Sequence, residues 1–350
     1  MYYLSDRRTK LKIKNRMLLP SILMLLCLIV PLFNSGLVSF ESVYSRGQNI
    51  SDPSSSPFSS VASFQSKAAI LDNMPSHNVT VGDINIAYKQ MGRPDAKPII
   101  LITGASATMD MWNPLLLEEL TSANYKVIIF ENRGVGGSTV GTKKFLISQF
   151  ANDTLGLLDA LGISKADVLG WSMGGFIAQQ LAVTNTDKVD NLILYATSCG
   201  GPNDRPTPPE VIQIGTNASM SVQERIQKLA PLFFAPASWF KAHPDYLNYF
   251  PISAYLANER DLSQQIHRQQ LEASANWTGT CNVLSNIRQP TLVIVGTDDD
   301  PAPDSLTLAE GIPGSWLIRI RDAGHGLMYQ HPDEFNRVLM AFLESNHEHK

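Results

Sequence analysis

The sequence is poor in cysteine and in charged residues, and both shortages exclude classes of protein. Only three cysteines occur in 350 residues, so the fold is not a small scaffold held together by disulfides. Charged residues make up 17% of the chain, hydrophobic residues make up 44%, and the net charge is −4. An ordinary apolar share with so little net charge excludes a wholly disordered chain. The length suffices to bury one large core or two small ones.

Lysine and arginine cluster only at the N-terminus. Residues 1–40 contain six basic residues and one acidic residue, which leaves a net charge of −9 for the remainder. Proteins that bind phosphate backbones need clustered Lys and Arg, and none follows residue 40. We therefore expect no nucleic acid among the partners.

Sequence motifs for metals and nucleotides are missing as well. The chain has neither an H-E-x-x-H motif nor a Cys/His cluster of the kind that holds zinc. The glycine-rich run at 133–138 lacks the G-K-[ST] of a phosphate-binding loop, and Thr139 breaks the G-x-G-x-x-G pattern. We expect neither a bound metal nor a cofactor.

The N-terminal part has the layout of an export signal. An uninterrupted apolar run extends from Met17 to Phe33, and all six basic residues precede it. The run is nearly long enough to span a bilayer, so residues 1–40 are predicted to be a signal peptide or an N-terminal membrane anchor. The positive-inside rule then places the body outside the cytoplasm. Residues 41–75 contain ten serines and three prolines, which predicts a linker.

Strands and helices alternate from residue 78 onward. Short β-like runs at 78–81 and 84–90 predict a hairpin, and continuous apolar runs predict buried strands at 98–103, 125–130, 166–169, 191–196, 291–295 and 316–320. Helical patterns fall at 112–120, 145–161, 173–183, 306–310 and 334–343. This alternation predicts an α/β fold with a mostly parallel central sheet flanked by helices.

One long segment interrupts the alternation. Residues 200–288 read as mostly helical and are rich in proline, which predicts a helical cap inserted between two parts of the core, 76–199 and 289–350. Within it, residues 231–250 contain seven aromatic residues; these either line a substrate pocket or pack the cap onto the core. Cys199 and Cys281, the only cysteines of the body, either pair in an oxidising compartment or remain buried thiols.

The predicted nucleophile is Ser172. It lies in a G-x-S-x-G pattern, residues 170–174, between a strand that ends there and a helix that starts there. This is the setting of a nucleophile elbow, in which a sharp turn lifts the serine above the sheet. Small residues two positions before and after the serine are required because larger side chains would collide.

A serine hydroxyl needs a base, and the base needs an acid to orient it. His325 is the predicted base because it follows a predicted strand and has a glycine on either side. Asp299 is the predicted acid, three residues after Gly296 at the end of another strand. Its neighbours Asp298 and Asp300 are expected to be solvated or to serve in turns and caps.

Negative charge on a reacting carbonyl oxygen needs preorganised N–H donors. We expect one donor to be the amide of Met173, directly after the nucleophile. The other should come from the loop after the strand at 98–103, with the amide of Ala105 as the predicted donor.

Together these residues resemble the α/β-hydrolase superfamily. The chain order Ser172, Asp299, His325 is that of the superfamily, and residues 131–138 resemble its D-x-R-G-x-G-x-S loop. Residues 197–202, 296–303 and 322–326 are similar to the enol-lactonase and cofactor-free haloperoxidase-like branch. That resemblance implies ester or lactone hydrolysis without a cofactor, under a helical cap. Two positions depart from the family pattern: Thr103 replaces the usual histidine before Gly104, and Glu131 replaces the usual aspartate.

The leading hypothesis is therefore a serine hydrolase acting on a small carboxylic ester or lactone through an acyl-enzyme. A cofactor-free perhydrolase or haloperoxidase-type activity with the same triad is the alternative. A non-catalytic ligand-binding protein on this fold is a minor alternative, motivated only by the altered residues at 103–104.

Overall fold

The computed structural model describes residues 61–202, 208–215, 217, 219–246, 264–299 and 304–346. The predicted signal peptide or anchor, residues 1–40, lies outside these ranges. Within them, no helix is both long and apolar enough to cross a membrane.

The centre of the protein is an eight-stranded sheet in the order β1-β2-β4-β3-β5-β6-β7-β8. The strands are β1 (His77–Val81), β2 (Ile84–Met91), β3 (Lys97–Ile102), β4 (Tyr125–Phe130), β5 (Ala166–Trp171), β6 (Val189–Tyr195), β7 (Thr291–Gly296) and β8 (Trp316–Ile320). Only the pairings of β2, with β1 and with β4, are antiparallel; the other neighbouring pairs are parallel. The predicted hairpin and the mostly parallel sheet are confirmed.

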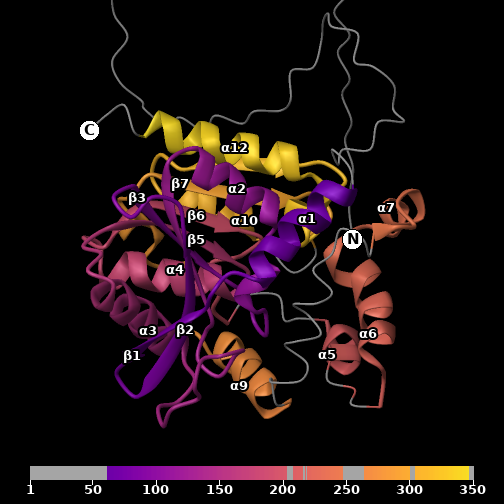
Figure 1. Cartoon of the computed structure of the whole chain (residues 1–350), viewed down its shortest axis with the longest axis horizontal. Coiled ribbons are helices and arrows are strands. Elements are labelled where there is room, and N and C mark those ends of the chain that lie inside the picture. Colours follow the sequence, from indigo (N-terminus) through magenta and orange to yellow (C-terminus); the bar gives the residue numbers. More distant parts are fainter. Residues whose placement is uncertain are drawn as a thin grey trace, which may run out of the picture. The chain divides into compact units, whose positions relative to one another are not determined.

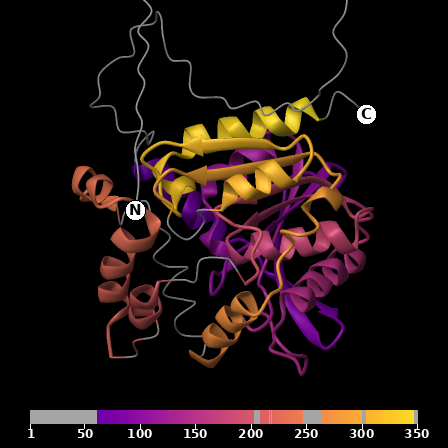
Figure 2. The same cartoon turned by 180° about the vertical axis from the view of Figure 1, so that it is seen from behind.

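Helices cover both faces of the sheet, as Figures 1 and 2 show. Ile99 and Leu101 of β3 belong to one buried cluster, together with residues of α1 (Val61–Asp72), α2 (Pro114–Ser122), α11 (Leu327–Gln330) and α12 (Pro332–Ser345). Ile100 and Ile102 belong to the other cluster, with residues of α3 (Ile147–Ala160), α4 (Met173–Thr184) and α10 (Ser305–Gly311). Strands buried on both faces explain why their sequences are continuous apolar runs.

The segment between β6 and β7 is mostly helical where the structure describes it. It contains α5 (Pro209–Gly215), α6 (Val222–Leu229), the π-helix η2 (Ala230–Phe234), α7 (Ala237–Ala242), α9 (Gln264–Ala275) and the short 3-10 helix η4 (Leu284–Asn286). These elements fall within the predicted cap insertion. A disulfide joins Cys199 to Cys281, with 5.1 Å between the two Cα atoms. It closes the base of the insertion. The two cysteines therefore pair and do not remain buried thiols.

The structure corrects the expected linker at 41–75, because residues 61–72 form helix α1. Phe64 and Leu71 of this helix are buried against the core. The buried Lys89 of β2 donates a 2.8 Å hydrogen bond to the carbonyl of Leu71 and a 2.7 Å hydrogen bond to Asp110. The serine-rich composition of the stretch concealed the few apolar residues that dock this helix.

Candidate active site

Ser172 lies in the turn between β5 and α4. Its φ of 57° and ψ of −121° place a residue with a side chain in strained backbone geometry, as a nucleophile elbow requires. Its amide donates to the carbonyl of Tyr195, and its carbonyl accepts from the amide of Gly175. A Cβ at Gly170 would lie 2.3 Å from the carbonyl oxygen of Gly174, and one at Gly174 would lie 2.0 Å from that of Ile102. The glycines at both positions are therefore obligatory for the turn.

His325 and Asp299 meet in loops that follow neighbouring strands. The structure places Nδ1 of His325 3.0 Å from Oδ1 of Asp299, and both side chains are buried. The two loops are held together, because Asp298 donates its amide to the carbonyl of Ala323. Gly296 lies against the same carbonyl so closely that a Cβ there would be 2.0 Å from it. Of the three adjacent aspartates, Asp299 faces the histidine, Asp298 is exposed, and Asp300 lies outside the described residues.

Tyr195 connects the serine turn to the histidine loop, a role that the sequence did not predict. Its hydroxyl donates a 2.7 Å hydrogen bond to the carbonyl of His325 and accepts from the amide of Met328. Its ring stacks on Trp171, the residue before the serine, at an interplanar angle of 13°. Burial raises the pKa of Tyr195 well above that of an exposed tyrosine, so the hydroxyl keeps the proton that it donates. The sequence signal that could have identified Tyr195 is its position at the end of β6, which lies beside the end of β5.

The loop predicted to supply an oxyanion donor lies beside the serine. A Cβ on Gly104 would be 3.1 Å from Cβ of Ser172 and 3.6 Å from its Oγ, so the Gly104 backbone touches the serine side chain. Met173, the other predicted donor, begins helix α4, and its amide is among those that an α-helix leaves unpaired at its first turn. Met173 thus follows Ser172 directly, and Gly104, the residue before Ala105, lies against the serine side chain.

Thr103, which stands where the family pattern has histidine, supports the loop predicted to supply an oxyanion donor in another way. Its buried hydroxyl donates to the carbonyl of Ala107 at 3.1 Å. The amide group of Asn132 donates to the carbonyl and hydroxyl oxygens of Thr103 at 3.2 and 3.3 Å. Thr103 therefore supports the loop through these hydrogen bonds, in place of the histidine of the family pattern.

Glu131, the second departure from the family pattern, also supports this region. Its Oε2 accepts a 3.0 Å hydrogen bond from the amide of Met109, in the 3-10 turn η1 (Met109–Met111). Burial is the main cause that raises the pKa of Glu131 to about 8; the Met109 hydrogen bond and the charge of Lys89 oppose the rise, and the nearby Asp110 adds to it. The buried side chain is largely protonated at neutral pH, and it stabilises η1 as a hydrogen-bond acceptor rather than as a charged ligand.

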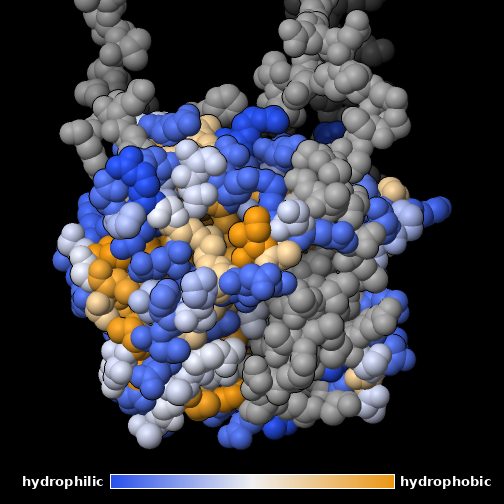
Figure 3. Space-filling model, in the orientation of Figure 1, coloured by the Kyte–Doolittle hydropathy of each residue, from blue (hydrophilic) through white to orange (hydrophobic). Residues whose placement is uncertain are grey.

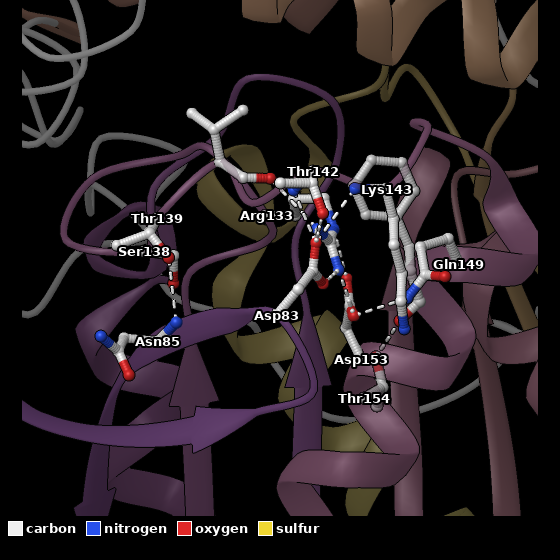
Figure 4. Close-up of polar contacts among 12 residues, drawn as sticks. Asp83, Asn85, Arg133, Ser138, Thr139, Thr142, Lys143, Gln149, Asp153 and Thr154 are labelled. Atoms are coloured by element: carbon white, nitrogen blue, oxygen red, sulfur yellow. Dashed lines mark hydrogen bonds and ion pairs between the residues drawn. The ribbon is translucent and has the colours of Figure 1, made fainter.

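Arg133 holds the loop after β4 through a buried ion-pair cluster, which Figure 4 shows. Its guanidinium makes two hydrogen bonds to Asp153 of α3, at 2.7 and 2.9 Å, and two to Asp83 of the hairpin turn, at 2.9 and 3.1 Å. Asp83 also accepts the amides of Thr142 and Lys143. Bidentate pairs fix geometry as well as charge, so this cluster fixes the positions of the hairpin, α3 and residues 131–143 relative to one another.

The cap touches the histidine loop directly. The carbonyl of Phe234 accepts a 2.8 Å hydrogen bond from the amide of Gly326. Added Cβ atoms at Gly324 and Gly326 would both lie under 3.0 Å from Phe234, so both glycines are needed for the contact. Other aromatic residues of 231–250 pack on one another, Trp239 against Phe240 and His243, which favours packing for them. Tyr249 and Phe250 lie outside the described residues.

A cavity of about 330 Å³ lies between α1 and α2, away from the predicted site residues. Its lining is mostly apolar and includes Ile70, Met74, Met91 and Leu117. Figure 3 shows hydrophobic residues gathered over these helices in a mainly hydrophilic face. No predicted catalytic or oxyanion residue lines this cavity. Across the described ranges, no group of three His, Cys, Asp or Glu side chains is arranged to hold a metal ion.

Comparisons with known proteins identify the family of the fold. The family model for the alpha/beta hydrolase fold matches residues 97–332. A putative non-heme bromoperoxidase, BpoC, of Mycobacterium tuberculosis is 30% identical over 278 residues, which cover 75% of this chain and 98% of that protein. The crystal structure of the enol-lactonase from Burkholderia xenovorans has a TM-score of 0.64 and 23% identity, and the match covers 77% of this chain and all of that one.

A third relative has a described activity. The structure of Est816, described as an N-acyl homoserine lactone degrading enzyme, has a TM-score of 0.63 and 25% identity, and the match covers 76% of this chain and all of that one. The predicted resemblance to the superfamily is confirmed by the family model, which spans more than half of the sequence. The chain belongs to the alpha/beta hydrolase fold family.

Proposed function

We propose that this protein is a serine hydrolase that cleaves a small carboxylic ester or lactone through an acyl-enzyme. The observation that carries the proposal is the buried pair of His325 and Asp299, 3.0 Å apart. The ring of His325 lies 6.0 Å from that of Trp171, the residue before Ser172. A histidine oriented by a carboxylate is the base that a serine nucleophile needs. The structures described as an enol-lactonase and as an N-acyl homoserine lactone degrading enzyme add support for the substrate class.

In the proposed mechanism, Ser172 Oγ attacks the carbonyl carbon while Nε2 of His325 takes the hydroxyl proton. Asp299 accepts from Nδ1–H, which fixes the tautomer and stabilises the imidazolium. The amides of Met173 and Ala105 donate to the oxyanion. His325 returns the proton to the leaving alkoxide, or to the ring oxygen of a lactone, and a water activated by the same histidine then releases the acyl group.

The test is hydrolysis of a panel of p-nitrophenyl esters and small lactones. Ser172→Ala should lower kcat by roughly 10⁴-fold or more. Ser164→Ala is the matched control, because Ser164 is exposed just before β5, and it should leave turnover unchanged. Full turnover in the Ser172→Ala protein would contradict the mechanism.

A perhydrolase or haloperoxidase-type activity is the second candidate, favoured by the similarity to the putative non-heme bromoperoxidase. The same serine would form an acyl-enzyme that hydrogen peroxide, rather than water, releases as a peracid. Halogenation that requires both acetate and hydrogen peroxide, with feeble ester hydrolysis, would favour this candidate over the first.

We also propose that the body is exported, either free or anchored by residues 1–40. The cationic flank and the apolar run support this, and so does the disulfide, since disulfides persist in oxidising compartments. Protease added to intact cells should digest the body, and deletion of residues 1–40 should protect it. Protection of the full-length chain by intact cells, with digestion only after lysis, would contradict export.

A further inference from the structure

The oxyanion loop, residues 104–106, is bonded to a cap helix that lies more than 150 residues away in the sequence. The amide of Ser106 donates a 2.7 Å hydrogen bond to Oε1 of Gln270, and its hydroxyl bonds to Nδ1 of His267. His267 and Gln270 are three residues apart in α9, so they lie on one face of that helix. Ser106 itself has a φ of 62°, a left-handed conformation that a serine adopts only when its surroundings enforce it.

The helix that makes these bonds is itself fixed on the core. Gln270 is fully buried, and its Nε2 points at the carbonyl of Arg133 at 3.5 Å. The side chain of Ile266, also in α9, lies about 3 Å from where a Cβ on Gly134 would be. Residues 133 and 134 belong to the loop that the ion-pair cluster of Figure 4 holds. A continuous set of contacts therefore runs from this cluster through α9 to Ser106.

The chemistry of His267 and Gln270 suits side chains that hold Ser106 in place. Burial lowers the pKa of His267, and the charge of Arg225 lowers it further, so the ring is neutral at neutral pH and has one nitrogen that can accept a hydrogen bond. Gln270 takes up the Ser106 amide, so that amide does not point at a bound substrate. This leaves the amides of Gly104 and Ala105 in the loop, and that of Ala105 is the predicted donor.

We propose that His267 and Gln270 are positioning residues that hold the oxyanion loop beside Ser172. The inference rests on the proposed hydrolase function and deepens it, because it makes one half of the oxyanion hole depend on the cap. If the loop were released from α9, the protein would keep its substrate pocket, but the Ala105 amide would be misplaced. Since the oxyanion forms only in the transition state, the loss should fall on kcat rather than on KM.

The first experiment compares Gln270→Met with Gln265→Met in the full chain, using the best p-nitrophenyl ester as substrate. Gln265 is an exposed glutamine of the same helix and is the matched control. Gln270→Met should lower kcat by roughly 10- to 100-fold and change KM by less than about threefold. Gln265→Met should change neither. Equal kcat values for the two variants would overturn the proposal.

The second experiment keeps the proposal testable if Gln270→Met fails to fold, since His267 is only partly buried. His267→Leu removes the bond to Ser106, whereas His267→Asn keeps a polar group where Nδ1 lies. The fall in kcat in His267→Leu should be most of the fall seen in Gln270→Met. His267→Asn should have at least a third of the wild-type kcat. Ser106→Ala combined with His267→Leu should be no worse than either single change. Equal loss in the Leu and Asn variants, or multiplicative losses in the double variant, would overturn the proposal.

The two proposals fail in different ways. If the wild-type chain shows no Ser172-dependent turnover, the proposed function is wrong, and the inference is wrong with it. If the wild-type chain turns over esters and all the α9 variants behave like Gln265→Met, the function stands and only the inference is wrong.

Discussion

Replacing Cys199 and Cys281 together with alanine should cost the protein a large part of its stability. The disulfide closes a loop whose ends are 82 residues apart. In the chain-entropy relation, a loop of that length restricts the unfolded state enough to contribute about 4.5 kcal/mol at 25 °C. Whole domains are stable by only about 5–15 kcal/mol, so the loss is a substantial fraction of the total. Alanine is preferred to serine because Cys199 is 3% exposed and a hydroxyl there would be buried.

The assay is urea unfolding, followed by the fluorescence of the five tryptophans. With a slope of roughly 3 kcal/mol/M, a loss of about 4.5 kcal/mol lowers the midpoint by about 1.5 M. Reduction of the wild-type protein should produce the same shift and should expose two further thiols in the denatured chain. The reasoning is refuted if the double variant and the oxidised wild type unfold at the same urea concentration. Failure to gain two thiols would show instead that the disulfide does not form.

Three further predictions concern single side chains. Arg133→Met leaves the buried Asp153 without its cation and should lower the free energy of unfolding by about 3–5 kcal/mol. Arg93→Met removes an exposed pair and should leave the urea midpoint unchanged. Glu131 has a native pKa of about 8 against 4.5 for an exposed glutamate, so the native carboxyl keeps its proton where the unfolded one has lost it. The free energy of unfolding should therefore fall as pH rises from about 5 to 8, and Glu131→Gln should remove up to about 1.4 kcal/mol of this fall per pH unit; parallel profiles for the two proteins would contradict the assignment. Asp299→Asn should keep the fold but lower kcat by roughly 10³- to 10⁴-fold, and activity within tenfold of wild type would rule out its role.

The features that local sequence could predict are those set by neighbouring residues. The core strands were predictable because a strand buried on both faces must be apolar at every position, as residues 125–130 are. The turn at Ser172 was predictable because Gly170 is required by a contact with Gly174, only four residues away; the contact that requires Gly174 is with Ile102 of β3, the strand beside β5 in the sheet. Asp299 was singled out from three aspartates by its distance from Gly296, and the structure places that member against His325.

The features that sequence could not predict depend on distant parts of the chain. Helix α1 was missed because its few buried side chains, such as Phe64, occur in a serine-rich stretch whose composition indicates a linker. The contacts of His267 and Gln270 with Ser106 span more than 150 residues, and no local pattern shows which face of α9 meets the core. Pairing of the cysteines likewise depends on how the insertion between β6 and β7 folds back on itself.

The most direct test of the central claim is covalent labelling of the native protein with a fluorophosphonate, followed by peptide mapping. A serine activated by a buried histidine and aspartate reacts with such a probe, whereas ordinary serines do not. The account predicts a single adduct on Ser172 that is lost in Ser172→Ala and slowed at least 100-fold in His325→Ala. An unlabelled wild-type protein, or an adduct on any other serine, would contradict it.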